Sequence, residues 1–170
     1  MELYRHRPKE AFRAHPVILS LIVFASLLLE VTLPPTLPLA RLFQLPLLVT
    51  IYFSMIRENQ VFGTAFGTIV GLLEDALSHG YLGQMGIAKA LVGYLAATAG
   101  LKLDFDNLVV RGFLIAVLVA IHNSSVYLLT RQLLGLPAPF EPLHILTSTL
   151  VNVALGLALF PLFDRLRKRA

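Results

Sequence analysis

The stretch GTAFGTIVGLLEDALSHGYLG, residues 63–83, decides how this chain folds, because it joins a ladder of glycines to an acidic pair. Gly63, Gly67 and Gly71 recur at every fourth position. Residues four apart lie above one another on a helix, so these glycines form a face without side chains. The next step of four reaches Asp75. The stretch therefore predicts a helix with one smooth face that ends in acidic residues.

An acidic pair and a lysine interrupt this otherwise apolar part of the chain. Glu74 precedes Asp75, and Lys89 lies in the apolar run that follows a turn near residues 80–83. If the two runs form a helical hairpin, Asp75 and Lys89 lie at a similar depth on its two arms. An unpaired charge in hydrocarbon costs about 2.5–3.5 kcal/mol on insertion scales. We therefore expect Lys89 to form an intramembrane ion pair with Asp75 or Glu74, and the sequence leaves both partners open.

A second set of glycines lies in the next apolar run. Gly86, Gly93 and Gly100 recur every seven residues. Small residues let helices approach closely, and close packing is what holds helices together in lipid. The two glycine sets therefore predict close helix contacts, either within this chain or as a groove for a partner or a second copy. The sequence leaves both interpretations open.

The composition leaves too little polar surface to face water on all sides. Only 14% of the 170 residues are charged, 56% are hydrophobic and the mean hydropathy is +0.76. Soluble domains carry about 25% charged residues. We therefore expect a single integral membrane domain over residues 1–170, with short basic tails at about 1–15 and 164–170. These tails favour contact with membrane lipid rather than nucleic acid. The absence of cysteine excludes disulfides and thiolate metal sites.

Six apolar segments are expected to form transmembrane helices, which makes the predicted fold an all-α polytopic membrane protein. Helices are expected because lipid cannot satisfy free backbone groups, and the alternation of a barrel strand is missing. The second segment is short for a span of about 20 residues, so it is expected to be tilted, bent or partly at the interface. The segments cover about residues 16–33, 43–56, 61–77, 82–101, 108–129 and 143–163.

Lysine and arginine are distributed unevenly between the two sides that six spans would create. Only Arg41 and Arg131 fall on one side. The positive-inside rule assigns the richer side to the cytoplasm, and with it both termini. The residues on that side are Arg5, Arg7, Lys9, Arg13, Arg57, Lys102, Arg111, Arg165, Arg167, Lys168 and Arg169.

Polar residues gather in the outer half of the expected spans. They are Glu30, His122, Asn123, Ser148 and Asn152. One interpretation is a polar cavity or a partner-binding site that opens outward. The other is a set of interhelical hydrogen bonds, each worth about 0.6 kcal/mol on average. The sequence leaves both open, although His122 alone is more typical of a packed, hydrogen-bonded histidine than of a ligand.

Motifs for catalysis are missing from the sequence. It contains no HExxH zinc pattern, no GxSxG nucleophile elbow and no GxxxxGK[ST] phosphate loop. A membrane aspartyl protease needs two aspartates from different helices, and Asp75 is the only aspartate well within an expected span. We therefore expect no catalytic residues, no metal site and no cofactor, and a protein that is not an enzyme.

Three short motifs resemble the central signature of the rod shape-determining protein MreD family, namely GLLEDALS at residues 71–78, LG at residues 82–83 and ALVGYL at residues 90–95. The length, the six-span layout and the basic ends agree with that family over essentially the whole chain. Asp75 matches the aspartate of the family pattern, whereas Glu74 and His79 depart from it.

The resemblance implies a non-enzymatic scaffold of the cell-wall elongation machinery in the bacterial inner (cytoplasmic) membrane. The implied partner is MreC, which has a single transmembrane helix. The wider complex is the RodA–penicillin-binding-protein synthase and the MreB filament. The resemblance also implies a six-helix fold similar to the substrate-binding (S) component of energy-coupling-factor transporters.

That fold supplies an alternative function, a small-molecule (vitamin-like) binding subunit of a membrane transporter. A shared fold does not by itself transfer a function. The short outer loops and the lack of tryptophan weigh against this alternative, because few groups are available to close over a vitamin ring. Maintenance of rod shape through protein–protein interaction is therefore the function that the sequence favours.

Overall fold

A computed structural model describes residues 16–32, 42–78, 81–103, 107–137 and 141–167 of the 170-residue chain. Over these residues the chain forms six α-helices and no β-strand, which confirms the all-α class and the number of helices expected from the sequence. A short π-helical stretch, η2 (Leu129–Leu133), continues the fifth helix. The α-helices are α1 (Pro16–Thr32), α2 (Leu45–Arg57), α3 (Gln60–Leu77), α4 (Gln84–Lys102), α5 (Leu108–Leu128) and α6 (Pro142–Arg167).

Two helical stretches among the described residues have the length and composition to cross a membrane. They are Leu108–Leu133, which joins α5 to η2, and Pro142–Arg165 in α6. Helices α1 and α2 are also apolar but shorter, with 17 and 13 residues. A helix rises about 1.5 Å per residue, so α2 is about 20 Å long.

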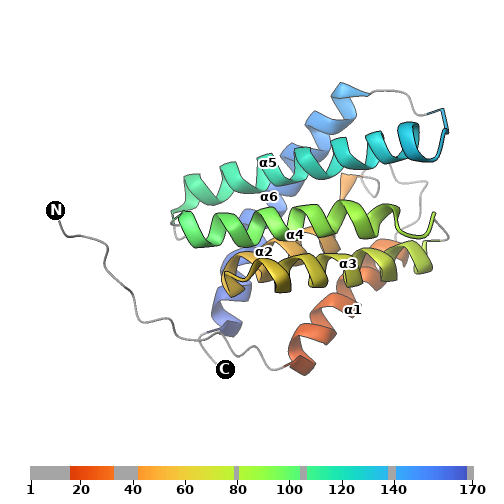
Figure 1. Cartoon of the computed structure of the whole chain (residues 1–170). Helices are drawn as coiled ribbons and strands as arrows, with labels where there is room; N and C mark the ends of the chain where they lie inside the picture. The colour runs from red at the N-terminus through yellow and green to blue at the C-terminus, as the bar shows by residue number, and fades with distance from the viewer. Residues whose placement is uncertain (1–15, 33–41, 79–80, 104–106, 138–140, 168–170) are drawn as a thin grey trace.

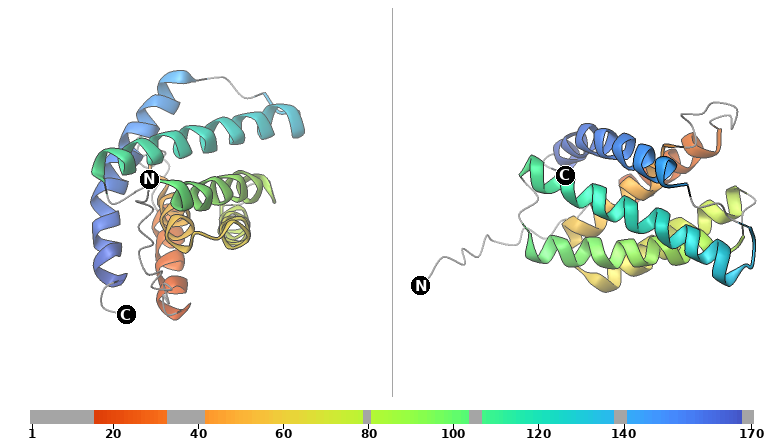
Figure 2. Two further views of the ribbon diagram at one scale, coloured as in Figure 1. Left: turned by 60° about the vertical axis from the view of Figure 1, so that its left-hand side comes forward. Right: turned by 90° about the horizontal axis from the view of Figure 1, so that it is seen from above.

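The helices from α2 to α6 alternate in direction, so their connections fall at two opposite ends of the molecule (Figure 1). Helices α3 and α4 lie side by side as an antiparallel hairpin, and α4 also packs against α2 and α5. Helix α6 packs on α5, while α1 packs mainly on α2. Figure 2 shows that α1 and α6 are inclined to the direction of α3, α4 and α5. This arrangement surrounds α2 with the other helices.

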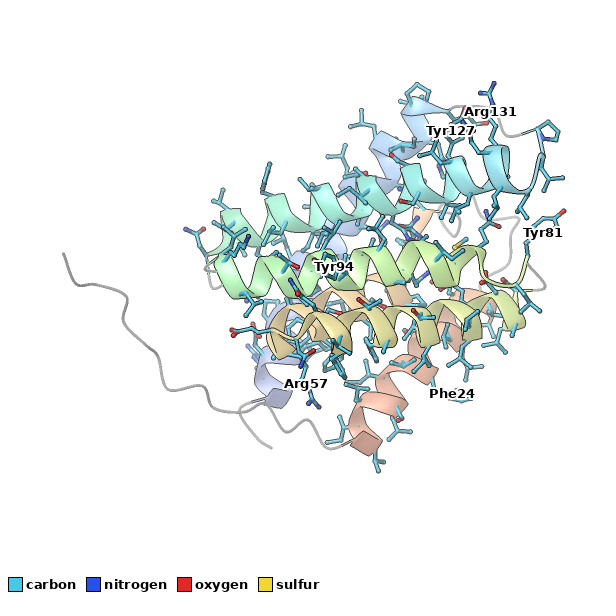
Figure 3. The ribbon with its side chains drawn as sticks, in the orientation of Figure 1. Phe24, Arg57, Tyr81, Tyr94, Tyr127 and Arg131 are labelled. Carbon is cyan, nitrogen blue, oxygen red and sulfur yellow. The ribbon has the colours of Figure 1, made fainter. Side chains whose placement is uncertain are left out.

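The two ends of the molecule carry different residues (Figure 3). Tyr81, Tyr127 and Arg131 lie at the end where α3 turns into α4, which we call the Tyr81 end. Arg57 lies at the opposite end, which we call the Arg57 end. Because α4 runs from the first end to the second, its last residue, Lys102, lies at the Arg57 end as well.

Two asparagines define where helices begin. Oδ1 of Asn59 accepts a hydrogen bond of 3.0 Å from the backbone N–H of Phe62 at the start of α3. Oδ1 of Asn107 accepts one of 2.9 Å from the backbone N–H of Val109 at the start of α5. The first N–H groups of a helix have no partner within the helix, so these caps fix both starting points.

Helix α2 is the centre of the fold. Every residue from 46 to 55 is buried, because α1, α3, α4, α5 and α6 all contact this helix. The ring of Tyr52 lies 5.1 Å from that of Phe160 and 5.0 Å from that of Phe163, between centroids. The segment expected at residues 43–56 is therefore a core helix covered by its neighbours.

Candidate functional site

The glycine face of α3 lies directly against the backbone of α4. Gly63, Gly67 and Gly71 each face a backbone carbonyl of α4 so closely that an added Cβ would overlap it. For Gly67 the carbonyl is that of Lys89. The smooth face predicted from the four-residue spacing is therefore occupied by the next helix of the same chain.

The glycines of α4 make matching contacts. Gly93 faces the carbonyl of Gly63, so the two helices touch glycine to glycine. A Cβ on Gly86 would lie 3.1 Å from a leucine side chain of α3, and Gly100 faces a backbone carbonyl of α2. All six predicted glycines thus serve packing within the chain, and none of these faces is left as an open groove for a partner.

The close α3–α4 contact brings together the buried lysine and one of the two acids. Nζ of Lys89 lies 2.7 Å from Oε2 of Glu74, and the two side chains are 2% and 9% exposed. The contact is an ion pair by distance rather than an aligned hydrogen bond. Of the two partners that the sequence left open, the structure pairs Lys89 with Glu74.

Asp75 is buried like Glu74, but its carboxylate has a different role. Its Oδ2 accepts hydrogen bonds from the backbone N–H groups of Gly83 at 2.9 Å and Gly86 at 3.3 Å, and its Oδ1 accepts one from Met85 at 3.1 Å. These groups form the start of α4, where the helix dipole favours a negative charge. Gly83 has φ of 97°, a conformation that suits glycine. Asp75 therefore fastens the α3–α4 turn and needs no lysine.

Glu30 brings a second carboxylate to the Lys89–Glu74 pair. It lies in α1 and interacts electrostatically with Glu74, which repels it, and with Lys89, which attracts it. The backbone N–H of Leu45, at the start of α2, donates to its carboxylate. Its Oε2 atom is buried and has no hydrogen-bond partner among the described residues. We call Glu30, Glu74 and Lys89 the charge centre.

His122 faces the charge centre from α5. The side chain is buried, at 2% exposure, and interacts electrostatically with Lys89. Its Nδ1 atom has no hydrogen-bond partner within the part of the chain that the structure describes. The buried, hydrogen-bonded histidine expected from the sequence is thus buried, but one of its ring nitrogens is unsatisfied.

Gln44 connects α2 with α5 and α6. Its Nε2 donates to Oδ1 of Asn123 at 2.6 Å, and its backbone N–H donates to Oδ1 of Asn152 at 3.0 Å. Nδ2 of Asn152 in turn donates to the backbone carbonyl of Leu42 at 2.7 Å, and the Ser148 hydroxyl donates to the same carbonyl at 3.3 Å. Asn152 and Ser148 therefore fix the residues that precede α2 through hydrogen bonds. Of the two interpretations left open by the sequence, interhelical hydrogen bonding describes these two residues.

Gln44 was not predicted as a site residue, although it stands out as a single amide in the run LFQLP before α2. Within the described residues, its Oε1 and the Nδ2 of Asn123 have no hydrogen-bond partner. Buried polar atoms are nearly always hydrogen-bonded, so these atoms call for an explanation. Unsatisfied atoms of Glu30, Gln44, His122 and Asn123 all lie on residues linked to the charge centre.

A second ion pair, at the Arg57 end, was missed by the sequence analysis. The Nη1 atom of Arg111 in α5 lies 3.0 Å from Oδ2 of Asp164 in α6, and the Tyr52 hydroxyl of α2 donates to Oδ1 of Asp164 at 2.8 Å. Arg111 is buried, and the carboxylate of Asp164 compensates its positive charge. Arg111 falls just inside the expected segment 108–129 and Asp164 directly follows the expected segment 143–163, and these positions were the available signal for a pair.

Comparison with models of protein families, with curated proteins and with solved structures found no match to this chain. Among the described residues, no group of three or more histidine, cysteine, aspartate or glutamate side chains is arranged to hold a metal ion. The buried charges and the polar atoms without hydrogen-bond partners make the charge centre, with His122, Gln44 and Asn123, the candidate functional site.

Proposed function

We propose that this chain is a multi-pass scaffold of the bacterial inner membrane, resembling the MreD family, that maintains rod shape by binding the single-span protein MreC. In this proposal it supports the RodA–penicillin-binding-protein synthase and the MreB filament, and it catalyses no reaction itself. All six helices cross the membrane, with both termini and the Arg57 end on the cytoplasmic side.

The distribution of apolar and charged side chains is the observation that supports the proposed membrane location. Large apolar side chains point outward on every helix that surrounds α2, for example Phe24, Ile69 and Phe113, which are 57%, 58% and 67% exposed. Charged side chains between the ends are buried in the charge centre. A body with an apolar girdle and paired interior charges is suited to lipid, where an unpaired charge is costly.

The distribution of basic residues supports the orientation. Arg57 and Lys102 lie at the Arg57 end, as do Arg111 at the start of α5 and Arg165 near the end of α6. At the Tyr81 end the exposed basic residue among the described ones is Arg131, which donates to the Tyr127 hydroxyl at 2.6 Å. Basic residues concentrate on the cytoplasmic side of membrane proteins.

The packing of the protein interior supports the scaffold role. The glycine faces and the core around α2 are filled by this chain's own helices, so partner helices meet an already folded body. Exposed apolar side chains on α1, α3, α5 and α6 remain for such contacts. Helices associate in lipid through this kind of surface packing.

A photo-crosslinking scan tests the proposal. A photoreactive amino acid is placed at an exposed apolar position on each of four helices, at Phe24, Ile69, Phe113 or Leu150. The chain is co-expressed with the single-span partner. We expect crosslinks to the partner from one face and none from the opposite face. Absence of crosslinks from all four positions, with the chain correctly inserted, would contradict the scaffold function.

A vitamin-like ligand site is the second candidate function, because Glu30, Gln44, His122 and Asn123 each carry a buried polar atom without a hydrogen-bond partner among the described residues. Equilibrium binding of labelled vitamins to the purified chain separates the two. Saturable binding that is lost on changing His122 or Asn123 would favour the transporter subunit over the scaffold.

A further inference from the structure

We propose that the charge centre of Glu30, Glu74 and Lys89 takes up one exchangeable unit of positive charge, either a proton on its carboxylates or a monovalent cation beside them. The inference concerns the protein interior and does not depend on which partner the chain binds. It rests on the charges that meet there, on the unsatisfied atoms around them and on the way these residues are linked.

The charges that meet in the centre do not balance. Glu30 and Glu74 bring two carboxylates, and Lys89 brings one ammonium group. Asp75 is compensated separately, by three backbone N–H groups at the start of α4. His122 faces Lys89 and adds no negative charge. When all three members are ionised, the buried centre therefore holds one negative charge in excess, and burial makes such a charge costly.

The unsatisfied atoms around the centre are mostly acceptors. Oε1 of Gln44 is an amide oxygen and only accepts hydrogen bonds, and Oε2 of Glu30 only accepts them when the carboxylate is ionised. Nδ1 of His122 accepts when the ring proton is on Nε2. Hydrogen-bond acceptors that have no partner among the described residues can bind a proton or a cation. A proton on Glu30 turns its free oxygen into a donor.

These atoms lie on residues that interact with the charge centre or that adjoin such residues in the sequence. The N–H of Leu45 donates to Glu30, and the neighbouring Gln44 donates to Asn123. His122, next to Asn123 in α5, interacts with Lys89, and Lys89 pairs with Glu74, which interacts with Glu30. The residues of this set come from α1, α3, α4, α5 and the start of α2.

The species that the charge centre takes up is expected to carry one positive charge rather than two. The residues that the structure describes hold no group of three or more His, Asp or Glu side chains suited to a metal ion. Lys89 also lies within the centre and repels a divalent ion more strongly than a proton or a monovalent ion. A proton and a monovalent cation both restore neutrality, and they differ in how the centre responds to salt.

Infrared spectroscopy of the whole chain in lipid nanodiscs tests the proposal. The carbonyl band of a protonated carboxylic acid is followed from about pH 5 to about pH 9, first with choline as the only cation and then with added Na⁺ or K⁺. We expect the band to persist above the range in which exposed carboxyls lose their protons. If added Na⁺ or K⁺ abolishes the band in a saturable way, the monovalent ion is the occupant. If the band is insensitive to salt, the occupant is the proton.

Single substitutions assign the signal. Glu30→Gln and Glu74→Gln each remove the excess charge, so each is expected to abolish the band, since Lys89 then pairs with the remaining carboxylate. The matched control is Glu141→Gln, at an exposed residue before α6, which is expected to keep the band. Where a glutamine variant fails to fold, Glu30→Asp keeps the charge and is expected to shift the band. A wild-type spectrum with neither the protonated band nor an ion-dependent change overturns the proposal, as does a band that survives both glutamine substitutions.

Discussion

Nζ of Lys89 lies 2.7 Å from Oε2 of Glu74, while the adjacent Asp75 accepts hydrogen bonds from three backbone N–H groups and no lysine. Two consecutive acids thus have separate tasks. Glu74 joins α3 to α4 through charge, and Asp75 fixes the turn between them. The close packing of glycines is what brings Lys89 within reach, because Gly67 lies against the Lys89 carbonyl.

Replacing Lys89 with methionine is expected to destabilise the chain severely. The substitution keeps most of the side-chain volume but leaves Glu74 and Glu30 buried without a cation. Removing one partner of a buried ion pair costs about 3–5 kcal/mol. The measurement is the yield of monodisperse protein and its thermal unfolding in detergent. Lys102→Met is the matched control, because Lys102 is an exposed lysine at the other end of α4. Equal yields of the two variants would show that Lys89 is not held by the carboxylates.

Adding one methyl group along the α3–α4 contact is expected to give graded losses of stability. In Gly67→Ala the new Cβ overlaps a backbone carbonyl, which cannot move aside, so we expect a loss of about 1–3 kcal/mol. In Gly86→Ala it meets the end of a leucine side chain at 3.1 Å, which can shift, so the loss is expected to be smaller. Thermal unfolding of the purified variants measures both.

The control for this series is Gly112→Ala on α5. The nearest atoms to its new Cβ are leucine side-chain carbons at 3.7 Å and 3.8 Å, an ordinary contact distance. Alanine favours a helix over glycine by about 1 kcal/mol, so this variant is expected to be as stable as the parent or more stable. If all three variants unfold at the same temperature, the glycines of α3 are not in close contact with α4.

Asp75→Asn tests the cap of α4. Asparagine keeps an oxygen acceptor but loses the negative charge and one of the two acceptor atoms. We expect a loss of about 1 kcal/mol in stability, in keeping with the effect of caps and helix dipoles. Asp75→Ala is expected to lose more, because every hydrogen bond to the turn disappears. The two variants are compared by thermal unfolding, and an alanine variant no less stable than the asparagine variant would contradict the capping role.

Tyr52→Phe tests the second network, at the Arg57 end. It removes only the hydroxyl that donates to Asp164, and the ring contacts with Phe160 and Phe163 remain. A hydrogen bond to a charged group contributes about 1.5–3 kcal/mol, and we expect a loss in this range. Arg111→Met is expected to cost more, since it leaves Asp164 without its cation. A tyrosine variant with unchanged unfolding would argue against the network.

The absence of cysteine makes the proposed orientation easy to test, because single cysteines can be labelled without a background signal. Tyr81→Cys and Arg131→Cys are expected to react with a membrane-impermeant thiol reagent in intact cells, from the outer side. Arg57→Cys and Lys102→Cys are expected to react only after the membrane is opened. Labelling of both pairs from the same side would contradict the proposed multi-pass arrangement.

The helices were predictable from the sequence because their signals are local. Apolar runs, for instance, predict a helix over residues 61–77, and the structure gives α3 as Gln60–Leu77. The four-residue spacing of glycines likewise identified a close contact face. It did not identify the occupant of that face, since spacing carries no information on whether the neighbouring helix comes from the same chain.

What the sequence left undetermined depends on the packing of distant segments. The choice of Glu74 over Asp75 follows from which carboxylate points toward Lys89 once the turn has folded. The pairing of Arg111 with Asp164 joins residues 53 positions apart, and the bond from Gln44 to Asn123 spans 79 positions. The central place of α2 is also a property of the assembled bundle.

Co-purification with the single-span membrane partner tests the proposed scaffold function of this chain. The untagged chain is co-expressed with affinity-tagged MreC, extracted in mild detergent and analysed by size exclusion with quantitative mass spectrometry. We expect the two proteins to elute together at a fixed ratio. An MreC truncated before its transmembrane helix is expected to leave the chain behind. Elution of a folded, monodisperse chain apart from full-length MreC would show that the chain is not a scaffold for this partner.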